Sequence, residues 1–200
     1  MDALFKSKSL VNKVMFQPPD PPEYDDTLPN LIWISNDDND NQLPAVLLQR
    51  PDAEYIIIYS HGNAMDIAYV GDIGQVFVGD LEVNFLGFDY TGYGLASKSN
   101  SPSEKSAKKD MRMAYRFVRD KLKWPADRII LYGQSIGTGV ACYGADYARE
   151  QGDNIMALIL HSPYLSIRQL AEAIAGTLGK LIANRFNNLD LLENVLDCHY

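Results

Sequence analysis

The seven residues GQSIGTG, at positions 133–139, decide how the rest of the chain is interpreted. They follow the apolar run RIILY (128–132) and precede VACYGADYAR (140–149), which has the composition of a helix. A serine in a G-x-S-x-G sequence between a strand and a helix suits a nucleophile. The sharp turn projects its hydroxyl above the sheet, and the flanking glycines relieve the crowding at the turn. The sequence therefore predicts Ser135 as a catalytic nucleophile, with a tight packing turn and an idle serine as the alternative.

The helix after Ser135 also predicts where a negatively charged oxygen would be held. A helix that begins near Ile136 offers free N–H groups and the positive end of its dipole, so the Ile136 amide is one predicted oxyanion donor. The second donor is expected from HGNA (61–64), a glycine-containing loop after another apolar run, as the backbone amide of Asn63 or Ala64. His61 is expected to brace this loop, because in this arrangement the base follows the nucleophile in sequence.

A third loop, DYTGYG (89–94), ends the apolar run between these two motifs. The carboxyl ends of parallel strands share one edge of a sheet, where ligands of open α/β folds bind. Its tyrosines and glycines predict a loop that approaches substrate closely, and an ordinary glycine turn with packed tyrosines is the alternative. The predicted substrate pocket comprises His61, Gly62, Tyr90, Tyr93 and Gln134.

From residue 55 onward, short apolar runs alternate with longer amphipathic segments, the pattern of a parallel sheet with helices on both faces. The expected strands are 55–60, 84–90, 127–133 and 155–162, and the expected helices are 64–80, 103–122 and 137–150. Before them, 31–35 and 44–50 predict an antiparallel hairpin across the polar turn NDDNDNQ. The fold class is therefore α/β, a three-layer arrangement with a mostly parallel sheet.

Composition narrows the function further. The chain has 200 residues, 46% of them hydrophobic, as expected for one globular domain. A formal net charge of -8 argues against a general nucleic-acid binder. Cys142 and Cys198 form no disulfide framework and no metal-ligand spacing, which favours a reducing, cytoplasmic setting. No cofactor and no metal ion is predicted, and no apolar stretch is long enough to span a membrane.

Residues 1–26 are expected to form an amphipathic segment and a proline-rich connector (17–26), followed by one α/β domain at 27–200. Leu4, Val11, Val14 and Met15 could share one helical face beside basic residues. Peripheral membrane contact through residues 1–16 is therefore one hypothesis. A helix packed on the domain is the other.

Four motifs in order, SHGNAMDI (60–67), FDYTGYG (88–94), GQSIGTG (133–139) and HSPYLS (161–166), resemble those of the α/β-hydrolase superfamily. Most closely they resemble the α/β-hydrolase-domain-containing seventeen family of protein depalmitoylases. The resemblance implies an α/β-hydrolase fold with a nucleophile elbow at Ser135 and an oxyanion hole. It also implies a serine hydrolase of acyl esters or thioesters, with palmitoylated proteins or lipid-like esters as substrates. A serine-aminopeptidase-like hydrolase shares the same scaffold and is the alternative.

Two departures from this family are visible. Residues 1–30 lack the N-terminal cysteine cluster of the depalmitoylases, which weakens the expectation of membrane attachment. After Ser135 only His161 and His199 could supply a base. His161 comes too early for the base, while Asp190 and His199 are only nine positions apart, too close for loops after successive parallel strands. We therefore expect an N-terminal two-thirds of the domain without the acid and base, and a non-catalytic acyl- or partner-binding homologue is the second hypothesis.

Overall fold

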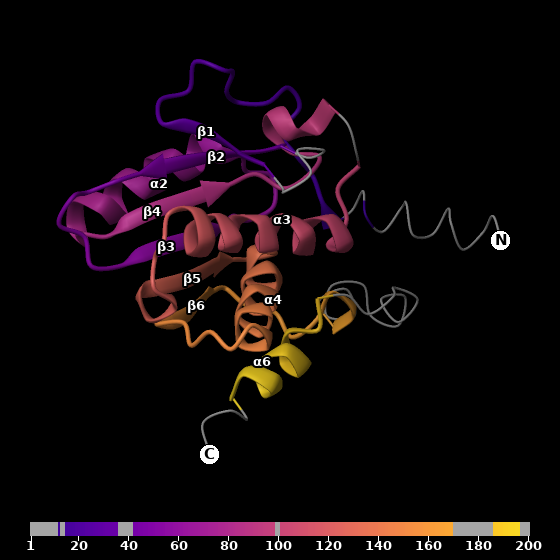
Figure 1. Cartoon of the computed structure of the whole chain (residues 1–200). Helices are drawn as coiled ribbons and strands as arrows, with labels where there is room; N and C mark the ends of the chain where they lie inside the picture. The colour runs from indigo at the N-terminus through magenta and orange to yellow at the C-terminus, as the bar shows by residue number, and fades with distance from the viewer. Residues whose placement is uncertain (1–11, 13–14, 36–41, 99–100, 170–185, 197–200) are drawn as a thin grey trace, which may run out of the picture.

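The computed structural model describes residues 12, 15–35, 42–98, 101–169 and 186–196, and the structural statements below concern these residues. Within them, six strands form one sheet in the order β1-β2-β4-β3-β5-β6 (Figure 1). The strands are β1 (Leu31–Ser35), β2 (Gln42–Leu48), β3 (Ile56–Ser60), β4 (Asn84–Phe88), β5 (Ile129–Gln134) and β6 (Ala157–His161).

The sheet is mostly parallel, as the sequence predicts. β3 lies between β4 and β5 and is parallel to both, and β5 is parallel to β6. β2 is antiparallel to both β1 and β4, so the predicted hairpin is confirmed, with its second strand two residues earlier than expected. In the register, Ser60 lies opposite Gly133, and Gln134 lies opposite His161. The carboxyl ends of β3, β5 and β6 therefore meet at one edge.

Helices cover both faces of the sheet. The helical segments are α2 (Ile67–Asp80), η1 (Gly94–Lys98), α3 (Glu104–Arg116), the π-helix η2 (Phe117–Lys121), η3 (Ala126–Arg128), α4 (Gly137–Glu150) and α6 (Asn188–Leu196). α2 packs on β2 and β4 in a cluster with Ile57 and Tyr59. Ile56 and Ile58 belong to the cluster of α3 and α4, which lie together in front of the sheet in Figure 1. Because side chains alternate between faces along a strand, the two clusters occupy opposite faces, and the three-layer α/β prediction is confirmed.

Local signals in the sequence set the helix boundaries. α2 begins at Ile67, three residues later than expected, because the Asp66 side chain accepts the Ala68 N–H and caps the helix. α3 begins after Ser103, which forms a capping box with Ser106. α4 spans the predicted residues, 137–150.

The N-terminal part of the chain is only partly described. The proposed helical face and the acidic turn at 36–41 lie outside the described residues, apart from Met15, which is buried together with Phe16. Residues 17–26 form no helix or strand, as predicted. In the described residues no helix has the length and apolarity needed to cross a bilayer, and no group of three metal-ligating side chains is placed to hold an ion.

Candidate active site

Ser135 occupies the turn between β5 and α4 and is exposed. Its φ of +51° lies in the left-handed region, which is costly for a residue with a side chain. Hydrogen bonds on both sides hold this conformation. The Ser135 N–H donates to the His161 carbonyl at 2.9 Å. The Ser135 carbonyl accepts from the Thr138 N–H at 2.9 Å and from the Thr138 hydroxyl at 2.6 Å. The backbone thus presents the Ser135 hydroxyl at the edge where the parallel strands end.

Two glycines around Ser135 are required by close backbone packing. A Cβ atom on Gly137 would lie 2.0 Å from the Ser60 carbonyl oxygen and 2.6 Å from the His61 carbonyl oxygen. On Gly133, a Cβ atom would lie 2.4 Å from the Gly137 carbonyl oxygen. The first turn of α4 therefore packs directly on the end of β3, which brings the loop after β3 beside Ser135.

The loop of residues 61–65, which we call the oxyanion loop after the donors that the sequence predicts in it, passes next to Ser135. A Cβ atom added to Gly62 would lie 3.7 Å from Ser135 Cβ. Ala64 is exposed and has a φ of +57°. Among the described residues, the backbone N–H groups of Asn63, Ala64 and Ile136 have no acceptor. These are the amides that the sequence predicts as oxyanion donors.

The N-terminal segment of residues 15–24, which we call the N-terminal strap, holds the oxyanion loop from outside. The Asn63 side-chain oxygen accepts the Gln17 N–H and the Tyr93 hydroxyl, each at 2.8 Å. The Phe16 ring packs edge-on against Tyr93 with 6.4 Å between ring centroids. The Asn63 side chain is therefore engaged in holding the loop. These contacts could not be predicted from the sequence, because a proline-rich segment is typical of a connector.

Tyr24 anchors the other end of the strap. Its hydroxyl donates to Asp89 Oδ2 at 2.5 Å and accepts the Leu95 N–H at 3.1 Å. The Glu23 N–H donates to Asp66 Oδ2 at 2.7 Å, next to the start of α2. Burial, followed by the nearby Asp89 carboxyl, raises the pKa of Tyr24, so its hydroxyl stays protonated and able to donate. The strap thus bonds to the loops that follow β3 and β4.

His61 supports the oxyanion loop from beneath. Its ring is fully buried and stacks on Tyr90 with 4.1 Å between centroids, and its Nδ1–H donates to the Gly62 carbonyl at 2.7 Å. Its Nε2 lies 3.6 Å from Asp89 Oδ1 and has no hydrogen-bond partner. Burial lowers the pKa of His61 to about 4, so the imidazole is neutral at pH 7. This geometry fits a brace for the loop.

The structure corrects the predicted substrate pocket. His61, Tyr90 and Tyr93 are fully buried, so none of them offers a surface to a substrate. The Tyr90 hydroxyl donates to the His61 carbonyl at 2.7 Å. Gly62 is buried against Ser135, while Gln134 is half-buried and accepts the Tyr59 hydroxyl at 2.5 Å. The aromatic residues of the 89–94 loop therefore form a base under the oxyanion loop and not the lining of a pocket.

No base for Ser135 lies within the described residues, where its hydroxyl has no hydrogen-bond partner. His161 faces Tyr132, with 3.2 Å between its Nδ1 and the tyrosine hydroxyl. Asp190 is exposed on α6, bonded to the Asn187 side chain. His199 lies outside the described residues.

Asp110 is a buried acid that the sequence did not single out. On α3, it accepts the Thr91 N–H at 2.7 Å and the Thr91 hydroxyl at 2.9 Å, and so ties the 89–94 loop to the helix. Burial raises the pKa of Asp110 to about 7, against the effect of the Thr91 hydrogen bonds. The folded protein therefore binds an extra proton here between about pH 4 and 7, relative to the unfolded chain.

The extra proton on Asp110 leads to a prediction for the stability of an Asp110→Asn variant as a function of pH. The contribution of Asp110 to the free energy of unfolding is full below about pH 4 and is lost as the pH rises to about 7. Asparagine does not titrate. The free energy of unfolding of the variant should therefore lie below that of wild type by an amount that shrinks by about 1 kcal/mol or more over that range. Urea unfolding at several pH values measures it, with Asp120→Asn, which changes an exposed carboxylate on η2, as the control. A deficit that grows with pH would contradict the prediction.

Comparison with known proteins identifies similar chains. A family model described as serine aminopeptidase S33 matches residues 51–200. The mouse protein named alpha/beta hydrolase domain-containing protein 17C is 32% identical over 168 residues, which cover 82% of this chain and 49% of that protein. The Caenorhabditis elegans protein named alpha/beta hydrolase domain-containing protein aho-3 is 27% identical over 209 residues, covering 94% and 60%.

A crystal structure of an alpha-beta hydrolase from Vibrio vulnificus has the same fold, with a TM-score of 0.69 at 19% identity. The match covers 83% of this chain and 59% of that one. An esterase from the bacterial hormone-sensitive lipase family matches with a TM-score of 0.55 at 18% identity, covering 96% of this chain and 62% of that one. The chain thus spans between 49% and 60% of the length of the two curated relatives.

Proposed function

The chain belongs to the α/β-hydrolase family, and we propose that it is a serine hydrolase of acyl esters or thioesters in which Ser135 is the nucleophile. The observation that carries this proposal is the exposed Ser135 at φ +51°, beside amides that have no acceptor among the described residues. A strained serine next to free amide donors is the arrangement that acyl transfer requires.

In the proposed reaction, Ser135 Oγ forms a bond to the carbonyl carbon of the acyl group, and the carbonyl electrons move onto its oxygen. The amides of Ile136 and of Asn63 or Ala64 donate to this oxyanion, with the N-terminus of α4 adding the positive end of its dipole. Collapse of the intermediate expels the alcohol or thiol and leaves an acyl group on Ser135. Water then attacks this acyl-serine, releases the acid and restores the hydroxyl.

The proton of the Ser135 hydroxyl has to pass to a general base and then to the leaving group. His61 is an unsuitable base because its ring is buried and its Nδ1–H is committed to the Gly62 carbonyl. His161 faces Tyr132. We propose that the base and its orienting carboxylate come from outside the described residues.

We favour an acyl substrate over a peptide because of Met65, an apolar residue in the loop that passes beside Ser135. A Cβ atom added to Gly62 would lie 3.4 Å from the Met65 sulfur and 3.7 Å from Ser135 Cβ, so Met65 and Ser135 both lie close to the same glycine. Palmitoyl groups on proteins are the finer proposal, consistent with the relatives named alpha/beta hydrolase domain-containing 17. Peptide hydrolysis, as the serine aminopeptidase model suggests, is the competing reaction.

A fluorophosphonate probe, which reacts with activated serines, tests the nucleophile. With the full-length gene product, we expect labelling of wild type, no labelling of Ser135→Ala, and undiminished labelling of Ser101→Ala, which changes another exposed serine. Equal labelling of the Ser135→Ala variant, or no labelling of a folded wild type, would refute the proposal and favour an acyl-binding protein without turnover. Release of thiol from palmitoyl thioesters, compared with cleavage of aminoacyl peptides, then separates the two substrate classes.

A further inference from the structure

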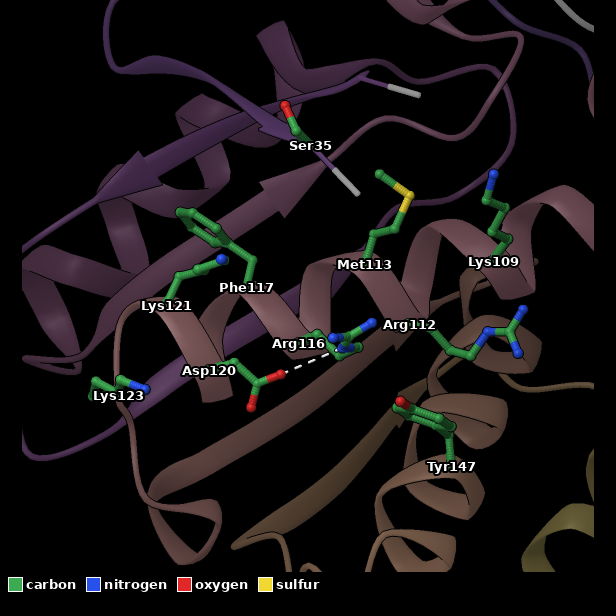
Figure 2. Close-up of a pocket in the computed structure, with 10 residues that line it drawn as sticks. All are labelled: Ser35, Lys109, Arg112, Met113, Arg116, Phe117, Asp120, Lys121, Lys123 and Tyr147. Atoms are coloured by element: carbon green, nitrogen blue, oxygen red, sulfur yellow. Dashed lines mark hydrogen bonds and ion pairs between the residues drawn. The ribbon is translucent and has the colours of Figure 1, made fainter. Parts of the chain in front are cut away.

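A hollow of about 560 Å³ lies beside α3 and η2 (Figure 2). Its charged lining consists of five cations and one acid, and we call it the basic groove: Lys109, Arg112, Arg116, Asp120, Lys121 and Lys123. All five cations are exposed. η2 lies shortly before β5 in the chain, whereas Ser135 follows β5. The groove residues on η2 therefore lie toward the opposite edge of the sheet from Ser135.

The groove concentrates positive charge in an acidic protein. Residues 105–123 carry eight of the 18 Lys and Arg residues and only two acids, Asp110 and Asp120, a net charge of +6 within a chain of -8. Of the two acids, Asp110 is fully buried. The net negative charge of the protein repels anions, so attraction of an anion is confined to this positively charged segment.

Pairing of charges differs between the groove and the rest of the surface. Elsewhere, Arg50 pairs with Glu82 at 2.7 Å and Arg128 with Glu54 at 3.1 Å. In the groove, Arg116 pairs with Asp120 at 3.3 Å. The remaining four cations have no carboxylate within 4.0 Å among the described residues: Lys109, Arg112, Lys121 and Lys123. Acidic residues outnumber basic ones in this chain, so a shortage of carboxylates does not explain why these four cations lack a partner among the described residues.

The size and lining of the groove fit a compact ligand. Its volume lies within the range of about 300–1,000 Å³ that small-molecule sites occupy. Met113, Phe117 and Tyr147 give it an apolar part between the cations. Several cations around one small hollow suit a group with several negative charges, and phosphate oxygens accept hydrogen bonds from both guanidinium and ammonium groups.

We propose that the basic groove is a binding site for a multiply phosphorylated group, carried by a soluble molecule or by a lipid headgroup. Ser35 also lines the groove. The competing hypothesis is that the acidic residues 36–41, which follow Ser35 in the sequence, bind there instead. The proposal is independent of the chemistry at Ser135, so labelling of Ser135 and binding at the groove can fail separately.

Isothermal titration with inorganic tripolyphosphate tests the site, and flotation with phosphatidylcholine vesicles containing phosphatidylinositol bisphosphate distinguishes the two sources. The groove variant is Lys109→Gln with Arg112→Gln. The matched control, Arg50→Gln with Arg128→Gln, removes the same charge from paired arginines elsewhere. We expect the groove variant to weaken binding about tenfold or more and the control to weaken it less than about twofold. Wild-type binding should also weaken with added salt.

Binding of tripolyphosphate would assign a soluble ligand, and binding to the vesicles alone would assign a lipid headgroup. Equal weakening in the groove variant and the control would overturn the proposal, because general electrostatics would then explain the binding. No binding of either probe would overturn it too. Binding that appears only after Asp37, Asp38 and Asp40 are replaced by asparagine would assign the groove to this chain's own acidic segment, and would overturn the proposal as well.

Discussion

Replacing Gly137 with alanine is expected to lower the free energy of unfolding by about 3 kcal/mol or more. The new Cβ atom would lie 2.0 Å from the Ser60 carbonyl oxygen and 2.6 Å from the His61 carbonyl oxygen. Both are backbone atoms at the end of β3 and cannot rotate away as a flexible side chain would. The contact can be relieved only by moving α4 away from the sheet, and this displaces Ser135 as well. Any variant that still folds should therefore react with the fluorophosphonate probe more slowly than wild type.

Gly79→Ala is the matched control for this prediction. Gly79 lies within α2, and a Cβ atom added there would meet nothing within 4 Å. Alanine is favoured over glycine in a helix by up to about 1 kcal/mol, so this variant should be as stable as wild type or slightly more stable. Urea unfolding of both variants measures the difference. If Gly137→Ala were as stable as Gly79→Ala, the close packing of α4 on β3 would be wrong.

The parts of the fold that could be predicted are those determined by residues adjacent in sequence. The start of α4 follows from GQSIGTG, because the glycines and the turn at Ser135 determine where the helix begins. The sequence predicts a mostly parallel sheet but not the order of its strands. Continuous apolar runs indicate that a strand is buried on both faces, without showing which strands lie next to it. Helix α2 began later than expected because the capping by Asp66 outweighs the apolar periodicity before it.

The parts of the site that could not be predicted depend on contacts between distant residues. Tyr24 and Asp89 are 65 positions apart, and Asp110 is 19 positions from Thr91. Nothing in a proline-rich segment indicates which loop its side chains and amides will bond. The sequence predicts Tyr90 and Tyr93 in a substrate pocket, but aromatic residues in a loop at this edge suit both binding and packing. Only their complete burial, with each hydroxyl bonded to the oxyanion loop, distinguishes the two.

Replacing Tyr24 with phenylalanine is expected to destabilise the protein by about 2 kcal/mol, although only one oxygen atom is removed. The change leaves the Leu95 N–H without its acceptor and Asp89 Oδ2 without its donor, and Asp89 is fully buried. A buried polar group that loses its partner incurs the desolvation cost without compensation. Tyr69→Phe, which removes a hydroxyl from a half-exposed ring on α2, should change stability by less than about 0.5 kcal/mol.

The same substitution should also slow the reaction of Ser135 with the fluorophosphonate probe, by about tenfold if about 1.4 kcal/mol of the lost energy comes from positioning the oxyanion loop. Tyr24 is a positioning residue in this argument, because the strap it anchors holds Asn63 through the Gln17 N–H. Loss of stability alone would leave the labelling rate of the folded protein unchanged at low temperature. Slower labelling in Tyr24→Phe, with Tyr69→Phe matching wild type, would therefore separate positioning from stability. Equal rates in all three proteins would mean that the strap stabilises the fold without controlling the site.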